Sequence, residues 1–311
     1  MRLNNSITIA SPHRYADLAR LWYRFARREL GAGLARRGIQ LDFLVFCDAG
    51  GTSFTSSALP GVRLLRPQPG MRDFIEFYDA ALSLPCEFLF FADADAFFLN
   101  GEWIASYPNV FQDPDVAAVS FVPRKSRPAI FALLCRADAF RELPRPVFAC
   151  RYEFPQSWPN GTNLQPGDLA FKELNQRGKR VINVDCEKSS KFIAMFRSTT
   201  GVRVTREHII RESGSDAFCK FLQEAPDYVA AAYDNMLLGA LYERLFGEPF
   251  ATDGVTSSEL KHAITVLRDR RQLASLREKF RASENAIHRM AAREGVELDL
   301  ATIIDELGVQ R

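Results

Sequence analysis

The sequence is poor in the residue types that mark specialised classes of protein. Its 311 residues include only 6 cysteines, 4 histidines and 3 tryptophans, and no two cysteines form a C-x-x-C pair. Such scattered cysteines argue against a structural zinc site or a disulfide framework, and they favour buried free thiols. No apolar run approaches the roughly 18 residues that a membrane-spanning helix needs. These absences leave an ordinary globular protein with no transmembrane segment.

The chain also lacks an excess of charge of either sign. Its 40 basic and 38 acidic residues give a net charge of +2, so no global field attracts it to nucleic acid. The N-terminal stretch MRLNNSITIASP has no apolar run of the kind that a signal peptide needs. The sequence therefore predicts a cytoplasmic protein, peripheral to a membrane at most, with no nucleic-acid partner.

Residues 6–185 alternate short apolar runs with helical patterns. Leu41–Cys47 and Cys86–Ala92 are typical of buried strands, and the segment 71–84 between them has a helical pattern. Strands that alternate with helices predict a mostly parallel sheet covered on both faces. The other predicted elements are strands at 6–10, 61–66, 116–122, 129–136 and 180–184, and helices at 13–30 and 168–177.

The pattern changes after about Ser213, where two long helical patterns follow, Ala217–Phe246 and Ser258–Glu294. Apolar residues of the second pattern alternate three and four positions apart, which is typical of a narrow helix-packing seam. We expect this seam to pack on the first helix as a hairpin against the α/β domain. A homodimer interface and a basic face on an anionic membrane are the alternatives. The predicted organisation is an α/β domain over residues 1–212 and an α-helical C-terminal extension over residues 213–311.

The most informative segment is FLFFADADAFFLNGEW, residues 88–103. Asp93 and Asp95 follow a fully apolar strand, and ligands of open α/β sheets bind beyond the carboxyl ends of strands. Carboxylates two residues apart in an extended segment point to the same side, where desolvating them unpaired is costly. A divalent cation that bridges them to a diphosphate removes that penalty. The pair predicts a metal site, although an Asp-rich turn after a strand can also be purely structural.

With these residues the chain resembles the nucleotide-sugar glycosyltransferases of the GT-A fold, whose D-x-D motif is similar to Asp93-Ala94-Asp95. The resemblance covers about residues 6–185 and rests on the order and spacing of its segments. It implies a Rossmann-like, mostly parallel sheet flanked by helices. The other matching segments are SITIASPHRY (first strand and donor loop), LVFCDAGGTS (second strand), ALLCRADAF (a later strand) and GDLAFKELNQRGKRV (an acidic helix start).

The resemblance implies how a donor would be held. Asp93, Ala94 and Asp95 would bind the donor diphosphate through Mn²⁺ or Mg²⁺, and Asp48 would read the nucleobase. UDP is the favoured nucleotide and GDP the next. As an alternative to donor binding, Tyr15 could instead pack in a helix, and Arg72 could be a solvated side chain. The further donor-binding candidates are Ala10, Ser11, Pro12, Tyr15 and Arg72.

Three residues are candidates for the remaining roles. Asp168 corresponds to an acid beneath the acceptor and is the candidate general base; Gly167 precedes it where related sequences have Glu. The alternative is a first-turn acid favoured by the helix dipole. His208, on an expected loop, is the candidate third metal ligand. The alternative is an ordinary surface or core histidine with no ligand role. Trp158 is the candidate for stacking on an acceptor ring, although loop tryptophans are often structural anchors.

These expectations describe a hexosyltransferase that uses a UDP-sugar and inverts configuration with Asp168 as base. The acceptor hydroxyl would belong to a carbohydrate, a glycolipid or a small molecule. A retaining enzyme of the same fold and a non-catalytic binding protein on this scaffold are the alternatives. The Q-x-x-R-W motif of processive synthases is absent from the sequence, which argues against polymer synthesis. A nucleotidylyltransferase would need a G-x-G-x-R loop after the first strand, where this chain has Ala10–Arg14.

Overall fold

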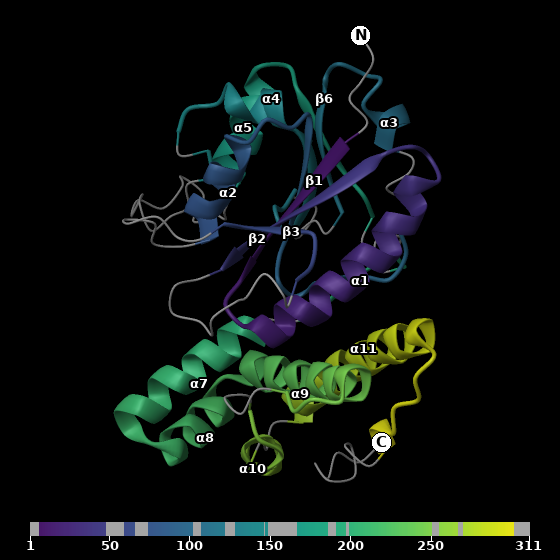
Figure 1. The fold of residues 1–311 in the computed structure, drawn as a ribbon. Coiled ribbons are helices and arrows are strands. Elements are labelled where there is room, and N and C mark those ends of the chain that lie inside the picture. The colour runs from purple at the N-terminus through teal and green to yellow at the C-terminus, as the bar shows by residue number, and fades with distance from the viewer. Residues whose placement is uncertain are drawn as a thin grey trace. The chain divides into compact units, whose positions relative to one another are not determined.

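The computed structural model forms two compact units, Met1–Ile193 and Ala194–Arg311. The colours run from purple to teal in the first unit and through green to yellow in the second (Figure 1). The residues that the structure describes are 6–47, 59–65, 74–101, 107–121, 128–145, 147–148, 167–185, 191–196, 199–250, 255–266 and 270–301.

The first unit is built on a sheet whose described strands are β1 (Ser6–His13), β2 (Gln40–Cys47), β3 (Val62–Leu65), β4 (Phe88–Ala92), β6 (Val116–Ser120), β7 (Ala132–Arg136) and β8 (Arg180–Asn183). Their spatial order is β3-β2-β1-β4-β7-β6-β8. β1 pairs in parallel with β2 and β4, and only β7 among these strands runs antiparallel to its neighbours. The prediction of a mostly parallel α/β sheet is confirmed.

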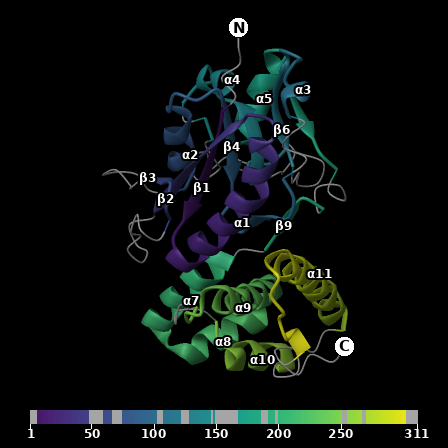
Figure 2. The same ribbon diagram turned by 45° about the vertical axis from the view of Figure 1, so that its right-hand side comes forward.

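Helices cover both faces of this sheet (Figures 1 and 2). Leu89 and Phe91 of β4 belong to the core that α2, α4 and α5 cover. Phe90 points the other way and packs on Phe98 with ring centroids 5.6 Å apart. On that face Trp22 of α1 meets Phe98 at 6.1 Å. The described helices of the unit are α1 (Ala16–Ala35), α2 (Phe74–Leu82), α3 (Tyr107–Val110), α4 (Ala137–Arg141) and α5 (Asp168–Gln176).

A short strand, β5 (Ala96–Phe98), follows β4 after a turn and pairs with β9 (Ile193–Met195) in a two-stranded sheet. Beyond β5 the chain passes very close to α1. A Cβ atom added at Gly101 would lie 2.0 Å from the Glu29 carbonyl oxygen. This contact requires glycine, because two backbones meet there with no room for a side chain.

The second unit is helical, as the sequence predicts. The chain divides between residues 193 and 194 and not between 212 and 213 as predicted, because α7 packs with α8 and α9. The helix predicted over Ala217–Phe246 is two helices, since Pro226 has no N–H to continue the first and instead begins the second. The described helices are α7 (Thr199–Ser213), α8 (Ser215–Glu224), α9 (Pro226–Phe246), α10 (Ser257–Val266) and α11 (Arg270–Glu294).

The predicted seam lies on α11 and packs against α9 within one chain. The rings of Tyr233 and Phe280 have centroids 4.1 Å apart, and the Tyr233 hydroxyl donates to Glu284 at 2.7 Å. The polar seam residue, Ser283, is buried and donates to the Lys279 carbonyl at 3.1 Å. The expected packing of this seam on the preceding helical pattern is confirmed, whereas its packing against the α/β domain and a homodimer through these helices stay predictions. Of the helices described, none is long and apolar enough to cross a bilayer.

Two glycines near α1 give a matched test of this packing. We expect Gly101→Ala to lower the free energy of unfolding by about 1–3 kcal/mol, because the added methyl group overlaps the α1 backbone. Gly31 lies inside α1, and apart from the backbone of α1 itself no atom of the described residues comes within 4 Å of the position that an added methyl group would take. Gly31→Ala should therefore raise the free energy by about 0.5–1 kcal/mol through helix propensity. Urea denaturation of both variants measures the difference, and equal stabilities would contradict the close approach.

Candidate functional site

Asp93, Ala94 and Asp95 form the turn between β4 and β5. The Asp93 N–H donates to the Phe131 carbonyl at 2.9 Å, and the Ala96 N–H donates to the Asp93 carbonyl at 3.0 Å. These backbone bonds fix the turn, and Ala94 is buried within it. Both aspartates are half-buried. The turn therefore presents two carboxylates at the carboxyl end of a strand that is buried on both faces.

The hydroxyl of Tyr78, on α2, interacts with both carboxylates. It donates a hydrogen bond to Asp93 Oδ1 at 2.7 Å. Burial raises the pKa of Tyr78 well above its usual value, and the charge of Asp93, this hydrogen bond and the charge of Asp95 raise it further. The hydroxyl thus stays protonated and acts as a donor.

Tyr78 was not predicted as a site residue, although the sequence contains a pattern that points to it. Side chains two residues apart on a strand share a face, so Asp93 lies on the side of Phe91. Tyr78 packs on Phe91 with ring centroids 4.9 Å apart. A tyrosine on the helix that covers this face is therefore a candidate partner for the first aspartate.

The end of β1 differs from the prediction. The strand continues to His13, so Ala10, Ser11 and Pro12 are strand residues and not a loop. Ala10 is part of the apolar core, and the Ser11 hydroxyl lies 3.0 Å from His13 Nε2. The hydrogen bond between these two polar side chains lets the strand extend into buried space. Tyr15, just before α1, is buried as well.

An ordered series of contacts joins this strand end to the acidic turn. The rings of His13 and Trp22 have centroids 5.1 Å apart. Trp22 in turn donates its indole N–H to the Ala96 carbonyl at 3.0 Å, one residue beyond Asp95. The conformation of the turn thus depends on residues of β1 and α1.

Asp168 is the first residue of α5 and is half-buried. Gly167 before it has a φ of 93°, which favours glycine. A Cβ atom there would also lie 2.7 Å from Ile130 Cγ2 and 3.0 Å from the ring of Phe171. This crowding explains why glycine stands where the resemblance expects Glu. Catalysis by Asp168 stays a prediction.

The remaining candidates lie elsewhere. His208 is in α7 and not on the predicted loop, because the segment from Thr199 to Ser213 is helical. It is exposed, and its Nε2 lies 3.4 Å from Glu212 Oε2, one turn along the helix. Metal ligation by His208 stays a prediction. Asp48, Arg72 and Trp158 lie outside the described residues.

Within the described part of the chain, no three His, Cys, Asp or Glu side chains come together as a metal-ligand set. The acidic turn offers two carboxylates, which are hard oxygen donors. Mg²⁺ and similar cations commonly take one or two protein carboxylates and complete their coordination with phosphate oxygens and water. The donor set therefore fits a cation that is held jointly by the protein and a diphosphate.

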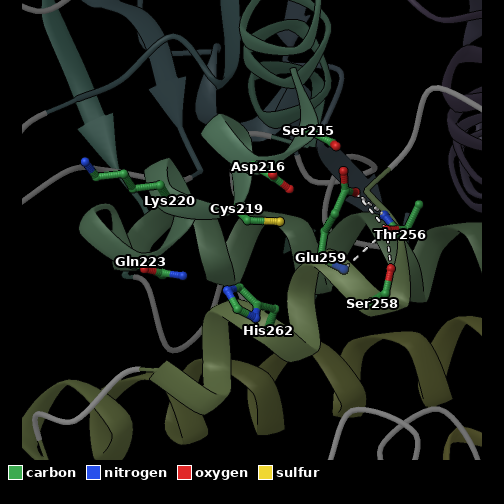
Figure 3. Close-up of a pocket in the computed structure, with 9 residues that line it drawn as sticks. All are labelled: Ser215, Asp216, Cys219, Lys220, Gln223, Thr256, Ser258, Glu259 and His262. Carbon is green, nitrogen blue, oxygen red and sulfur yellow. Dashed lines mark hydrogen bonds between the residues drawn. The ribbon is translucent and has the colours of Figure 1, made fainter. Parts of the chain in front are cut away.

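The second unit contains an open pocket of about 820 Å³ (Figure 3). Glu259 in this pocket accepts hydrogen bonds from the Thr256 N–H at 2.8 Å and hydroxyl at 2.9 Å, and from Arg206 at 3.0 Å. This is a capping box at the start of α10, readable from the letters TSSE, and its role is structural. The lining residues include none of the predicted site residues: Ser215, Asp216, Cys219, Lys220, Gln223, Thr256, Ser258, Glu259 and His262.

No protein-family model and no curated protein matches the chain. Solved structures that do match include a mannosyltransferase from Pyrobaculum calidifontis in complex with GDP-Man and Mn²⁺. It is 15% identical, with a TM-score of 0.45 over 97% of this chain and 85% of its own. Residues 1–349 of TarS from S. aureus match at 10% identity and a TM-score of 0.36, over 93% and 92%.

A third match is a Drosophila β-1,4-galactosyltransferase 7 mutant in complex with manganese, UDP-Gal and xylobiose. It is 12% identical, with a TM-score of 0.37 over 63% of this chain and 72% of its own. Glycosyltransferases are thus among the solved structures that this chain resembles. All three TM-scores lie below 0.5, so the activity must be inferred from the residues of the chain itself.

The buried imidazole of His13 gives a pH-dependence that can be measured. Burial lowers its pKa to about 3, whereas an imidazole in the unfolded chain titrates near 6.5. Between these values the unfolded chain binds a proton that the native chain does not, so stability falls as the pH falls. The contribution of the neutral His13 side chain to the free energy of unfolding is complete above about pH 6.5. It is lost as the pH falls towards 3, at up to about 1.4 kcal/mol per pH unit.

We expect His13→Gln to reduce the dependence of the unfolding free energy on pH between 7 and 5, because glutamine does not titrate. Urea denaturation at several pH values measures the slope. His262→Gln is the matched control, since His262 is exposed and its substitution should leave the slope unchanged. The same slope in His13→Gln and the wild-type protein would contradict burial of a neutral imidazole.

Proposed function

We propose that this chain is a metal-dependent glycosyltransferase that moves a hexose from a nucleotide-diphosphate sugar to an acceptor hydroxyl. One observation carries the proposal: Asp93 and Asp95 form a turn, held by backbone hydrogen bonds, at the end of central strand β4. Two half-buried carboxylates in one region repel each other, and a divalent cation with a diphosphate relieves this repulsion. UDP-sugars are the favoured donors.

Mn²⁺ or Mg²⁺, when bound, would stabilise negative charge on the departing diphosphate. Asp93 and Asp95 would hold the donor end of the site, with the backbone hydrogen bonds of Asp93 keeping the turn in place. Asp48 would contact the nucleobase, and Ser11, Pro12, Tyr15 and Arg72 are further donor-site candidates. His208 would add a ligand.

At the acceptor side, Asp168 would remove the proton from the attacking hydroxyl as sugar transfer inverts the anomeric centre. It is the first residue of α5 and is half-buried. Trp158 would stack on the acceptor, which is a carbohydrate, a glycolipid or a small molecule. Retention of configuration is the alternative outcome, in which Asp168 only orients the acceptor.

We expect Asp93→Asn and Asp95→Asn each to abolish donor hydrolysis and transfer while the fold is kept. Each variant removes a charge that binds the cation, so the Kd for UDP with Mn²⁺ should rise at least tenfold, about 1.4 kcal/mol. Hydrolysis of UDP-glucose and UDP-galactose, with and without Mn²⁺, together with calorimetric titration of UDP, provides the measurement.

Asp113→Asn is the matched control for this experiment. β6 runs parallel to β4, and Asp113 precedes it. Asp113 therefore lies at the amino ends of these strands, away from the acidic turn, and it pairs with Arg180. Activity close to wild type in either turn variant with Mn²⁺ present would refute the proposed function. The absence of donor hydrolysis in the wild-type protein would instead favour a non-catalytic binding protein.

Replacement of Asp168 tests the proposed base separately. We expect Asp168→Asn to lower kcat by about 100-fold or more while donor affinity changes little, as loss of a general base implies. Asp138→Asn is the control, because Asp138 is the first-turn acid of another helix, α4. A role limited to the helix dipole would give both variants a similar small loss of stability and normal rates. Normal transfer by Asp168→Asn would favour the retaining alternative.

A further inference from the structure

Tyr78 has a hydroxyl that its packing does not require. Its ring is fully buried and meets Phe91 and Phe148 edge-on, with centroids 4.9 and 6.1 Å away. A phenylalanine would fill the same space. A buried hydroxyl without a partner costs about 1–3 kcal/mol, and this one is satisfied by Asp93. The polar atom of Tyr78 is therefore tied to the acidic turn.

The helix that carries Tyr78 is itself held in place. Asp79, the next residue, accepts from the Val147 N–H at 2.9 Å and from Arg145 at 3.3 Å. Arg141 also donates to the Leu82 carbonyl at the last residue of α2, at 2.6 Å. These bonds fix α2 against the segment around α4. The Tyr78 hydroxyl is thus a donor at a fixed position beside β4.

A carboxylate that ligates a cation benefits from such a donor. Its side chain would otherwise rotate, and a hydrogen bond to one oxygen sets the direction of the other. We propose that Tyr78 is a positioning residue that holds one oxygen of Asp93, so that this carboxylate and Asp95 are oriented together towards a divalent cation. This inference rests on the proposed function. It assigns Tyr78 no contact with the substrate.

The role of donor fits the chemistry of the group. A tyrosine hydroxyl has one O–H, which it can donate to a carboxylate oxygen. Being uncharged, it stabilises Asp93 without competing with the cation for the site. A lysine in its place would neutralise the charge that the cation needs.

The test is Tyr78→Phe, which removes one oxygen atom. We expect the Kd for Mn²⁺ to rise about 10- to 100-fold, measured without donor or turnover by the electron paramagnetic resonance signal of free Mn²⁺. The Mn²⁺ concentration for half-maximal donor hydrolysis should rise in parallel. At saturating Mn²⁺ the kcat should return towards the wild-type value, because Tyr78 touches no reacting atom.

Tyr23→Phe is the matched control. It removes a hydroxyl of the same unit that donates to the Pro60 carbonyl at 2.5 Å, so it should affect stability at most and leave the Kd for Mn²⁺ unchanged. A second comparison uses the Asp93→Asn background, where Tyr78→Phe should cause no further loss of Mn²⁺ affinity. Thermal unfolding of each variant, with and without Mn²⁺, separates folding from binding.

The outcomes distinguish this inference from the proposed function. If Tyr78→Phe binds Mn²⁺ like the wild-type protein while Asp93→Asn does not, Tyr78 is only structural and the inference is overturned, but the proposed function stands. Equal losses in Tyr78→Phe and Tyr23→Phe would overturn it too. If the wild-type protein itself binds no Mn²⁺, both the inference and the proposed metal site are wrong.

Discussion

The burial of β4 on both faces determines where polar chemistry can lie in the first unit. Every residue from Phe88 to Ala92 is at most 2% exposed, because helices cover each side of the sheet. An ionised side chain within this strand would be desolvated without compensation. Polar residues can therefore follow only at the strand end, where Asp93 and Asp95 form a turn closed by backbone hydrogen bonds. The same core supplies the surface from which Tyr78 reaches the first carboxylate.

Much of this architecture could be predicted from apolar periodicity, and the exceptions have physical causes. The strand β1 is longer than predicted, because Ser11 and His13 bond to each other and so tolerate burial. The helix α7 was not predicted, because the small residues that follow His208 favour a loop, whereas Thr199–Ser213 is helical. Arg203 is fully buried in the structure, with its guanidinium carbon 5.1 Å from the centre of the Phe250 ring.

The parts of the candidate site that depend on residues close together in the sequence could be predicted. The Asp93–Asp95 pair and the start of α5 at Asp168 follow from short motifs. Tyr78 does not, because its contact with Asp93 spans 15 residues and depends on α2 lying over one face of β4. Because side chains alternate along a strand, the sequence indicates on which face of β4 the partner of Asp93 lies. Only the packed structure identifies that partner as Tyr78. Gly167, before Asp168, is likewise required by crowding from Ile130. Ile130 is distant in the sequence, so no local pattern predicts this requirement.

Trp22 gives the acidic turn an optical reporter. Its indole N–H is bonded to the carbonyl of Ala96, and its ring lies beside His13. Indole emission responds to its hydrogen bond and to neighbouring polar groups, so a rearrangement of the turn alters the fluorescence of a residue that lies in the core. The chain has 3 tryptophans. Replacing Trp103 and Trp158 by phenylalanine would leave Trp22 as the only tryptophan. The structure thus contains its own probe of the turn, with no added label.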